Sequence, residues 1–504
     1  MNFGIIKKTV GWMLLFEALF FLVPLITAAI YWEKAFFTFL LCIGICGALG
    51  GLCLIGKPKS DKIYAKEGFV ITALCWIVLS LFGCLPFVLS NSTKLSFIDA
   101  LFETVSGFST TGATIFPDGA TIEALPRSIL MWRSFTHWIG GMGVLVLIMA
   151  FLPLSGARNM HILKAESPGP TVGKLVPKVR TTAKILYIIY GALTLLQFIF
   201  MVCGGMPVFD AITTAFATAG TGGFAIKADG MAGYNSYLQI VVTVFMLIFS
   251  INFNSYYMLI KRRWKEVLTE EVRWFLAIVI VAISAVTLNV FLTQTVNALG
   301  EKMSFGEALK HSAFSVATMI STTGFSTEDF NTWPAFSQVI LVGLMFMGAC
   351  AGSTGGGIKV ARFLVLGKSA NNGIGKMLHP TQIKHVTMDN RVIEPEVVRS
   401  VFGYMIAYVA IFAVSFLIIS LDLGNLNLSA ITNGENGAFA TGFTSVAATL
   451  NNIGPGLGAV GPAGSFHDFS WWSKLVFIFD MLAGRLEIFP MIVLFAPLTW
   501  KKGV

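Results

Sequence analysis

Charge is scarce in this chain of 504 residues: Asp, Glu, Lys and Arg make up 12% of it, and hydrophobic residues make up 55%. Soluble domains carry about 25% charged residues, so a soluble globular protein is excluded. A run of about 20 mostly apolar residues can span a bilayer, and several stretches of this sequence reach that length. The sequence therefore predicts an all-α polytopic membrane protein.

Cysteine is also sparse, with seven residues and no metal-ligand spacing, which excludes a disulfide framework. An H-E-x-x-H metalloprotease motif is absent, and His137 forms no recognisable nucleophile–base pair with the scattered Ser and Thr residues. We also identify no dinucleotide-binding fingerprint, which needs its glycines between a strand and a helix. These absences argue against an enzyme and against a nucleotide bound by this chain.

Positive charge is in excess, with 35 Lys and Arg against 26 Asp and Glu. Most of these cations cluster in loops that a helix-by-helix topology places on one side, at 7–8, 57–66, 158–184, 261–273, 359–399 and 501–502. This is the positive-inside bias of membrane proteins and puts both termini in the cytoplasm. Nucleic-acid binding is not expected.

The chain begins with two apolar segments, at about 10–32 and 35–56, and then repeats one pattern four times. Each repeat has a full apolar span, a half-length amphipathic stretch, a Gly/Thr-rich turn and a second full span. The second spans are predicted at 126–152, 234–259, 336–366 and 471–494. We therefore predict an N-terminal helix pair and four pore repeats, at 1–63, 64–157, 158–262, 263–395 and 396–504.

The half-length stretches, of about 10–14 residues, are too short to cross a bilayer. Backbone cannot be left bare in hydrocarbon, so a turn at that depth must line a cavity. Four such turns in one chain predict four re-entrant loops around a central pore. The turn residues are Thr110, Thr111 and Gly112; Thr221, Gly222 and Gly223; Thr322, Thr323 and Gly324; and Asn452, Ile453 and Gly454.

The residue types of these turns suit a cation filter. Potassium gives up its hydration shell where rings of backbone carbonyls replace it, and glycine freely adopts the positive φ that such a backbone needs. The fourth turn has Asn452 and Ile453 in place of Thr, which predicts a pore that is only pseudo-fourfold. The alternative is that small residues merely let helices pack closely, but four turns in one setting favour a filter.

The four repeats, the N-terminal helix pair, "CAGSTGGGIK" at 350–359 and "SVAATLNNIGPGLG" at 445–458 together resemble the Trk/Ktr/HKT superfamily of potassium transporters, specifically its bacterial Trk-type membrane subunit. The resemblance covers essentially the whole chain. It implies that the four glycines line a filter that binds K⁺. In that family a Ser at the first of the four positions is associated with sodium permeation, so four glycines imply a preference for potassium.

A run of Gly, Ser and Thr interrupts the second span of the third repeat and cannot hold a stable helix. The run is not a phosphate-binding loop, because Val360 rather than Ser or Thr follows Lys359. A passive kink is one interpretation. The resemblance implies another, a gate beneath the filter formed by Gly352, Ser353, Thr354, Gly355, Gly356 and Gly357.

Arg485 lies midway along the last predicted span, where a charge must face the bundle interior or a partner. The resemblance implies that it projects into the ion path below the filter and works with the gate. Asp480 and Glu487 are its candidate counter-ions. A purely structural ion pair is the alternative.

Other ionisable groups receive weaker assignments. We expect Arg133 and His137 to be structural, and Glu17 has no assigned role. Acids near the outer ends of the half-length stretches are expected either to concentrate cations at the mouth or to be solvated loop residues; they are Asp99, Glu103, Asp210 and Glu435.

These observations predict potassium-selective uptake, channel-like and gated by the intramembrane loop. The resemblance implies a homodimer in the bacterial cytoplasmic membrane. It also implies a cytosolic regulatory subunit, and any nucleotide should bind that subunit and not this chain. The basic loops at 158–184 and 368–399 are long enough for such docking, although ordinary positive-inside loops would look the same. The alternative is a symporter that couples potassium to sodium or protons, a mechanism that usually places ionisable groups at midplane.

Overall fold

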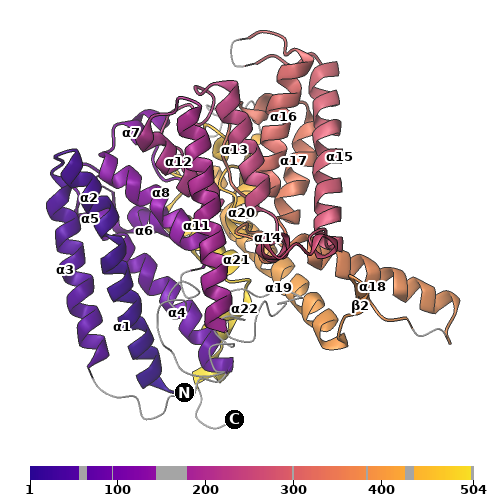
Figure 1. Ribbon diagram of the computed structural model, residues 1–504, viewed down its shortest axis with the longest axis horizontal. Coiled ribbons are helices and arrows are strands. Elements are labelled where there is room, and N and C mark those ends of the chain that lie inside the picture. Colours follow the sequence, from indigo (N-terminus) through magenta and orange to yellow (C-terminus); the bar gives the residue numbers. More distant parts are fainter. Residues whose placement is uncertain are drawn as a thin grey trace.

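The computed structural model describes residues 1–55, 65–93, 95–143, 179–297, 300–381, 384–425 and 436–500. Within these residues the only sheet is one antiparallel hairpin, β1 (Thr387–Met388) with β2 (Arg391–Val392). Everything else that is regular is helical (Figure 1). The all-α, multi-pass fold predicted from the sequence is confirmed.

The N-terminal helices lie at one side of the molecule (Figure 1) and are α1 (Phe3–Phe20), α2 (Leu22–Ile30) and α3 (Ala35–Leu54). They are fixed to the body through Glu33, in the turn between α2 and α3. Its carboxylate accepts hydrogen bonds from the backbone N–H groups of Arg127 and Ser128 at 2.7 and 3.0 Å. These N–H groups begin a helix and have no intrahelical acceptor, so the acid caps that helix.

The remaining helices follow the order of the four predicted repeats. The long first helices are α4 (Ala65–Gly83) with α5 (Leu85–Leu89), α11 (Val179–Cys203), α15 (Glu270–Leu292) and α19 (Pro395–Ser420). The short helices that precede the turns, called pore helices below, are α6 (Phe97–Phe108), α12 (Val208–Gly220), α16 (Phe305–Ile320) and α20 (Asn436–Leu450). The helices after the turns, called second helices, are α8 (Arg127–Gly141), α13 (Ser236–Phe249), α17 (Ala335–Met347) and α21 (Trp471–Arg485).

Shorter elements connect these helices. They are α7 (Gly119–Glu123), α14 (Phe253–Ile260), α18 (Val360–Leu378), α22 (Phe489–Phe495) and α23 (Pro497–Trp500), with 3-10 turns η1 (Trp264–Glu266), η2 (Phe330–Thr332), η3 (Leu423–Asn425) and η5 (Gly458–Val460). The predicted unit boundaries near residues 63 and 157 fall outside the described residues, as does Glu435.

The second spans differ from the prediction. In the described residues six helices are long and apolar enough to cross a membrane, or seven if a bent pair counts as one. None of the six is a second helix. The sequence predicted one interrupted second span, in the third repeat, but two others also break.

Each additional break has a local cause. The chain bends by 91° between α13 and α14, where the Asn252 side chain accepts from Asn254 N at 2.8 Å and so starts a new helix. Between α21 and α22, Glu487 and Ile488 take positive φ of 52° and 70°. Pro490 then stands in the first turn of α22, the only part of a helix that tolerates proline well. After α8, residues 144–152 of the predicted span lie outside the described part.

The second helices and the pore helices alternate around the molecule. Each second helix packs against the pore helix of the next repeat: α8 against α12, α13 against α16, and α17 against α20. The last second helix, α21, packs against the first pore helix, α6. The packing therefore runs in chain order around a closed ring.

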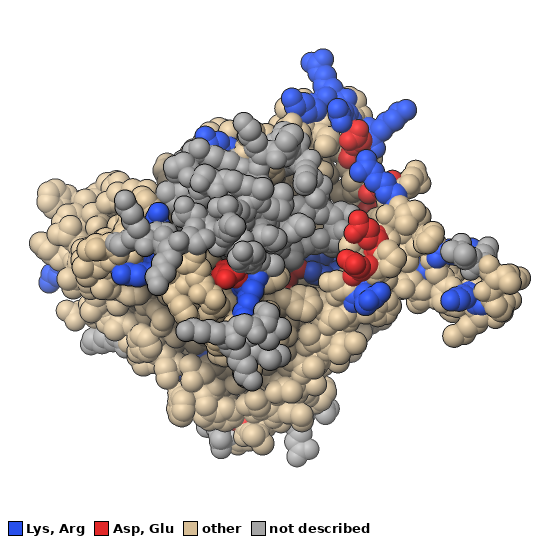
Figure 2. All heavy atoms as spheres, turned by 90° about the horizontal axis from the view of Figure 1, so that it is seen from below, with Lys and Arg blue, Asp and Glu red and all other residues tan. Residues whose placement is uncertain are grey.

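The two ends of the described chain meet at the lower end of Figure 1, where the rings of Phe3 and Trp500 stack with centroids 6.4 Å apart. In the lower half of the same view α18 projects sideways from the body. Figure 2 shows that Lys and Arg gather on the lower face. Four basic residues between α14 and α15 are exposed: Lys261, Arg262, Arg263 and Lys265.

Candidate functional site

The four predicted turns share one backbone conformation. The first residue of each turn has a positive φ, at 58° for Thr110, 56° for Thr221, 59° for Thr322 and 56° for Asn452. The glycine two positions later is positive again, at 79° for Gly112, 72° for Gly223, 89° for Gly324 and 95° for Gly454. Few non-glycine residues adopt this region, and Asn does so most readily. Asn452 therefore keeps the backbone conformation of the other three turns although its side chain differs.

The shared conformation is the way in which the pore helices end. In each turn the second residue donates its backbone N–H to a carbonyl five positions earlier, at 2.9 Å: Thr111 to Ser106, Gly222 to Ala217, Thr323 to Thr318 and Ile453 to Ala448. This is the hydrogen bond of a Schellman cap, in which a left-handed residue reverses the chain. The helix ends, with their negative dipole, therefore point toward the turns.

The turns meet one another at their glycines. A Cβ built on Gly112 would lie 1.9 Å from the carbonyl oxygen of Gly222, and one on Gly223 would lie 2.0 Å from that of Thr323. A Cβ on Gly324 would lie 2.1 Å from the Ile453 oxygen, and one on Gly454 would lie 2.7 Å from the Thr111 oxygen. Each glycine thus faces a carbonyl of the following turn, and the fourth faces the first. The structure brings all four predicted turns into one closed ring.

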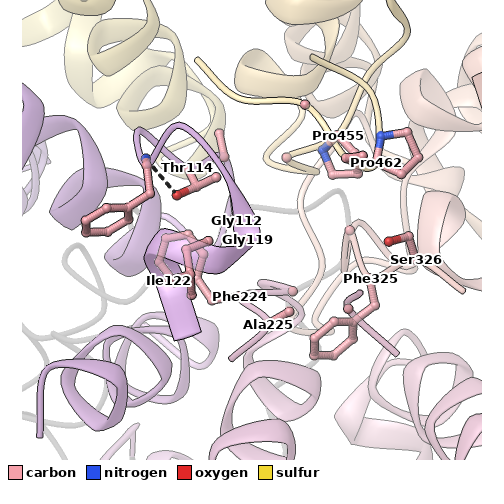
Figure 3. Close-up of a pocket in the computed structure, with 18 of the residues that line it drawn as sticks. Gly112, Thr114, Gly119, Ile122, Phe224, Ala225, Phe325, Ser326, Pro455 and Pro462 are labelled. Atoms are coloured by element: carbon pink, nitrogen blue, oxygen red, sulfur yellow. Dashed lines mark hydrogen bonds between the residues drawn. The ribbon is translucent and has the colours of Figure 1, made fainter. Parts of the chain in front are cut away.

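A cavity of about 110 Å³ adjoins the ring. It is lined by all four turn glycines and by residues that directly follow them, among them Thr114, Phe224, Phe325 and Pro455 (Figure 3). Asp118, Arg133 and Lys227 are the charged residues of its wall. The pKa of Asp118 lies below its ordinary value, because the side chain and backbone N–H of Thr121 donate hydrogen bonds to the carboxylate.

The acids expected at the mouth lie elsewhere. Asp99 pairs with Lys474 at 2.7 Å, and Asp210 accepts a hydrogen bond from the Tyr234 hydroxyl at 2.9 Å. Glu103 is neither a mouth acid nor a solvated loop acid, the two alternatives that the sequence left open, because the residue is 1% exposed and pairs with Arg133. Asp118 is the acid of the cavity wall, and sequence reasoning missed it.

Arg133 and His137, expected to be structural, hold backbone at the first two turns through hydrogen bonds. His137 Nδ1 lies 2.8 Å from the carbonyl oxygen of Gly107, and the backbone N–H of Phe224 lies 3.3 Å from Nε2. A carbonyl can only accept and an amide N–H can only donate, so the ring carries its proton on Nδ1 and is neutral. His137 therefore links the first pore helix to the second turn.

The predicted gate run forms an irregular loop, residues 348–359, between α17 and α18. The backbone N–H of Gly356 donates to the Thr322 hydroxyl at 2.7 Å, and a Cβ on Gly356 would lie 2.5 Å from the carbonyl oxygen of Asn451. The loop thus touches the third and fourth turns where their pore helices end. The cavity, in contrast, is lined by the residues that follow the turns.

Backbone contacts and one buried acid anchor this loop. Glu271, 4% exposed at the start of α15, accepts through Oε1 from the N–H groups of Ala351 and Ala361 at 2.7 and 3.1 Å. The break between α13 and α14 adds further bonds, such as Thr354 Oγ1 to the Phe249 oxygen at 3.2 Å. Two broken second spans therefore lie against each other, a relation that no local sequence pattern indicated.

Arg485 contacts backbone carbonyls from two other repeats. Its guanidinium donates to Gly140 and Gly141 at the end of α8, at 2.6 and 2.5 Å, and to Thr354 of the loop at 2.9 Å. Its two candidate counter-ions make other contacts. Glu487 pairs with Arg362, and Asp480 accepts from the Ser415 hydroxyl at 2.8 Å.

A buried cation, Lys359, belongs to the loop itself, although its place in the sequence grouped it with the basic loop residues at 359–399. Lys359 is 7% exposed, and its ammonium donates to the carbonyl oxygen of Gly355 in the same loop. The gate residues, Arg485 and Lys359 thus meet on the pore-helix side of the ring.

Comparison with known proteins agrees with this geometry. The sequence model of the TrkH family, described as a cation transport protein, matches residues 35–502. The chain belongs to the TrkH family. It is a multi-pass bacterial membrane protein of a transport family, and not an enzyme.

Relatives in the TrkH family match over their full length. The Trk system potassium uptake protein TrkH of Salmonella typhimurium is 35% identical over 100% of both chains. TrkG of Escherichia coli K12, also a Trk system potassium uptake protein, is 33% identical over 99% of both. The crystal structure of the potassium transporter TrkH from Vibrio parahaemolyticus superposes with a TM-score of 0.85 at 32% identity, covering 99% of this chain and 100% of that one.

Proposed function

We propose that this chain carries potassium into the bacterial cell through the ring of four glycine turns. The ring itself carries the proposal, because each turn glycine faces a carbonyl oxygen of the next turn. Closely spaced backbone carbonyls can replace the hydration shell of a potassium ion. The names of the relatives, potassium uptake proteins of the Trk system, support the same ion.

Potassium preference over sodium rests on the glycines. All four ring positions are Gly, whereas a Ser at the first position accompanies sodium permeation in the superfamily that the sequence resembles. A Cβ added at any of the four glycines would lie 1.9–2.7 Å from a carbonyl oxygen of the neighbouring turn. Any side chain there would therefore displace that carbonyl. The twelve turn residues would then hold the ion, chiefly through their backbone oxygens. They are Thr110, Thr111, Gly112, Thr221, Gly222, Gly223, Thr322, Thr323, Gly324, Asn452, Ile453 and Gly454.

Transport is proposed to be channel-like, with the loop at 348–359 as the gate. The loop hydrogen-bonds the third turn and lies against the fourth, so it would block an ion leaving the ring on that side. Arg485, bound to the loop at Thr354 and to α8, would hold the gate closed and repel cations. Inward flow would be driven by the membrane potential, about 2.3 kcal/mol per charge at 100 mV.

Coupled symport of potassium with sodium or protons is the second candidate. One observation favours it: Asp480, buried in α21, has an oxygen, Oδ2, without a hydrogen-bond partner. An ionisable group inside a bundle is a candidate ion or proton site. The residues of the four turns include no carboxylate, which favours the channel-like mechanism.

We further propose a homodimer under the control of a cytosolic nucleotide-binding subunit, since the relatives are named as members of a Trk system. Exposed Lys and Arg on the lower face in Figure 2 and the projecting α18 would form its docking surface. Of the two predicted docking loops, residues 158–178 lie outside the described part. That face would be cytoplasmic, with both chain ends on it.

Rubidium uptake into proteoliposomes with an imposed potential, negative inside, tests the proposal. Excess external potassium should block uptake by the wild-type chain, and sodium should not. Gly324→Ser should reduce this discrimination, because a Cβ there lies 2.1 Å from the Ile453 oxygen. Gly343→Ser is the matched control in the same repeat, because a Cβ on Gly343 meets nothing within 4 Å.

Three outcomes decide between the candidates. Uptake that needs only the potential and loses selectivity in Gly324→Ser alone supports the channel-like mechanism. Uptake that requires a sodium or proton gradient favours symport. Equal block by sodium and potassium in the wild-type chain, with the cytosolic partner added, would overturn potassium selectivity.

A further inference from the structure

A buried ion pair, Glu103 with Arg133, lies beside the first two turns, and Arg133 also lines the cavity that adjoins the ring. Arg133 of α8 donates through Nε to Glu103 Oε1 of the pore helix α6 at 2.7 Å, and the two side chains are 1% and 0% exposed. Removing two charges from solvent is costly unless their geometry is good and their other polar atoms are also bonded. The further contacts of each partner therefore show what this pair stabilises.

The Glu103 carboxylate holds the chain that leaves the first turn. Its Oε2 accepts from the backbone N–H of Ile115 at 2.9 Å, and the Thr114 hydroxyl lies 3.3 Å from each oxygen. Both contacted residues follow Gly112 closely. The carboxylate thus fixes how the first turn continues toward the cavity.

The Arg133 guanidinium extends the same support to the second turn. It donates through Nη1 to the Ala225 carbonyl at 3.2 Å, and its central carbon lies 3.9 Å from the centre of the Phe224 ring. Phe224 and Ala225 directly follow Gly223. One ion pair therefore fixes the backbone segments that follow Gly112 and Gly223, the glycines of two neighbouring turns.

The support is specific to this side of the ring. Glu103 lies nine positions before its turn glycine, Gly112. The residues nine positions before the other three turn glycines are Thr214, Ser315 and Ser445, and none of them is charged. In the third repeat His311 connects the pore helix and the outgoing chain: its Nδ1 lies 3.0 Å from the Thr327 hydroxyl, and its Nε2 lies 3.9 Å from Glu328 Oε1. The first and second turns are thus held by a short ion pair whose side chains are 1% and 0% exposed, whereas the His311–Glu328 contact of the third repeat is longer, at 3.9 Å, and its side chains are 10% and 12% exposed.

We propose that Glu103 and Arg133 are positioning residues that set the preference for potassium over sodium, by holding the first two turns at a spacing suited to the larger ion. The inference rests on the proposed function. Groups behind the atoms that bind an ion fix their orientation, and losing such a partner typically costs about 10–100-fold in affinity or activity. A ring freed on one side can contract around sodium.

Glu103→Gln tests the inference in the same rubidium assay, with sodium and potassium as competitors. The amide keeps the shape of the side chain but removes its charge. The sodium concentration that halves uptake should fall by roughly 10-fold or more, while potassium still competes. A purely structural defect would lower uptake without changing the ratio of the two competitors.

Asp99→Asn is the matched control, since it neutralises an acid on the same helix. Asp99 pairs with Lys474 at 2.7 Å near the surface, where its side chain is 22% exposed. This variant should keep wild-type discrimination. An equal loss of discrimination in Asp99→Asn would mean that surface charge, and not positioning, determines the effect, and would overturn the inference.

Glu103→Asp covers the case in which the Gln variant does not fold, as judged by its elution profile in detergent. It keeps the charge but is one methylene shorter, so it cannot reach both Arg133 and Ile115. Wild-type discrimination in the folded variants would overturn the inference and leave the proposed function intact. If the wild-type chain itself fails to discriminate, the proposed function fails first, and the two failures are distinguishable.

Discussion

The imidazole of His137 occupies the space that a side chain on residue 222 would need. A Cβ built on Gly222 would lie 2.1 Å from Nδ1 and 2.3 Å from Cγ of that ring. The first and third turns have Thr111 and Thr323 at the same position. The second turn therefore has glycine at position 222 because the imidazole of His137, from α8, fills the space that a side chain would occupy.

Gly222→Thr should damage the protein although it makes the second turn more like the first. Overpacking a well-packed site costs about 1–3 kcal/mol, so the thermal unfolding midpoint in detergent should fall and rubidium uptake should be largely lost. Adding His137→Ala should restore the midpoint in part. Gly191→Thr on α11, where a Cβ meets nothing within 4 Å, is the control, and equal midpoints for the two threonine variants would refute the crowding.

Arg485→Gln should open the gate. The substitution removes most of the charge-assisted bonds to Gly140, Gly141 and Thr354, and each such bond contributes about 1.5–3 kcal/mol. Rubidium uptake without any cytosolic partner should therefore rise by roughly 10-fold or more. Arg262→Gln, an exposed cation between α14 and α15, should leave uptake unchanged. Uptake in Arg485→Gln that equals the wild-type value would contradict a gating role.

Glu271 offers a paired test of the loop. Both N–H groups that it holds, those of Ala351 and Ala361, donate to the same oxygen, Oε1. Glu271→Gln keeps an acceptor there and should retain a closed gate, whereas Glu271→Ala leaves two buried donors unsatisfied, at about 1–3 kcal/mol each. The alanine variant should therefore release the loop.

Maleimide labelling of Cys350, a fully buried residue of this loop, measures that release. In a background where the other six cysteines are alanine, Glu271→Ala should label faster than the parent chain and Glu271→Gln should not. Labelling at equal rates in all three proteins would show that the acid does not hold the loop closed.

Asp118 should assist entry of cations through its charge. Its pKa is lowered by hydrogen bonds from Thr121, so the carboxylate is ionised throughout pH 6–8 and uptake should show no titration from this group there. Its contribution is lost only as the pH falls through the lowered pKa. Asp118→Asn keeps an acceptor for the α7 cap and should raise the half-saturating rubidium concentration at low ionic strength.

That increase should disappear in high salt, since the Debye length shrinks from about 30 Å at 0.01 M to about 3 Å at 1 M ionic strength. Glu301→Gln, an exposed acid remote from the cavity wall, is the control for general surface charge. An effect of Asp118→Asn that is independent of salt would indicate a lost structural contact.

Local chemistry explains what the sequence could predict. The turns and the break after α17 were identifiable because Gly, Ser and Thr stand next to one another at 110–112, 322–324 and 352–357, and each residue's own backbone preference acts there. The break between α13 and α14 carries neither Gly nor Pro, only Ser250 and Asn252, so it looked like a continuous apolar span.

Contacts between distant residues could not be predicted in this way. Glu103 and Arg133 come from different helices, as do His137 and Phe224, and no spacing along the chain relates them. From one sequence, Glu103 looked like an outer acid because its position on α6 was visible but its partner was not. The same holds for Arg485, whose contacts are backbone carbonyls that carry no side-chain signature.

The closure of the ring between Gly454 and the Thr111 carbonyl has a consequence for biosynthesis. The ribosome makes the first turn early and the fourth almost last, and Asn452 must still reach the Thr111 hydroxyl, at 3.0 Å, across 341 positions of chain. Three finished turns enclose nothing, because the gap between the third and the first remains open. The proposed ion pathway would therefore form in a single late step, when the last repeat of the chain enters the membrane.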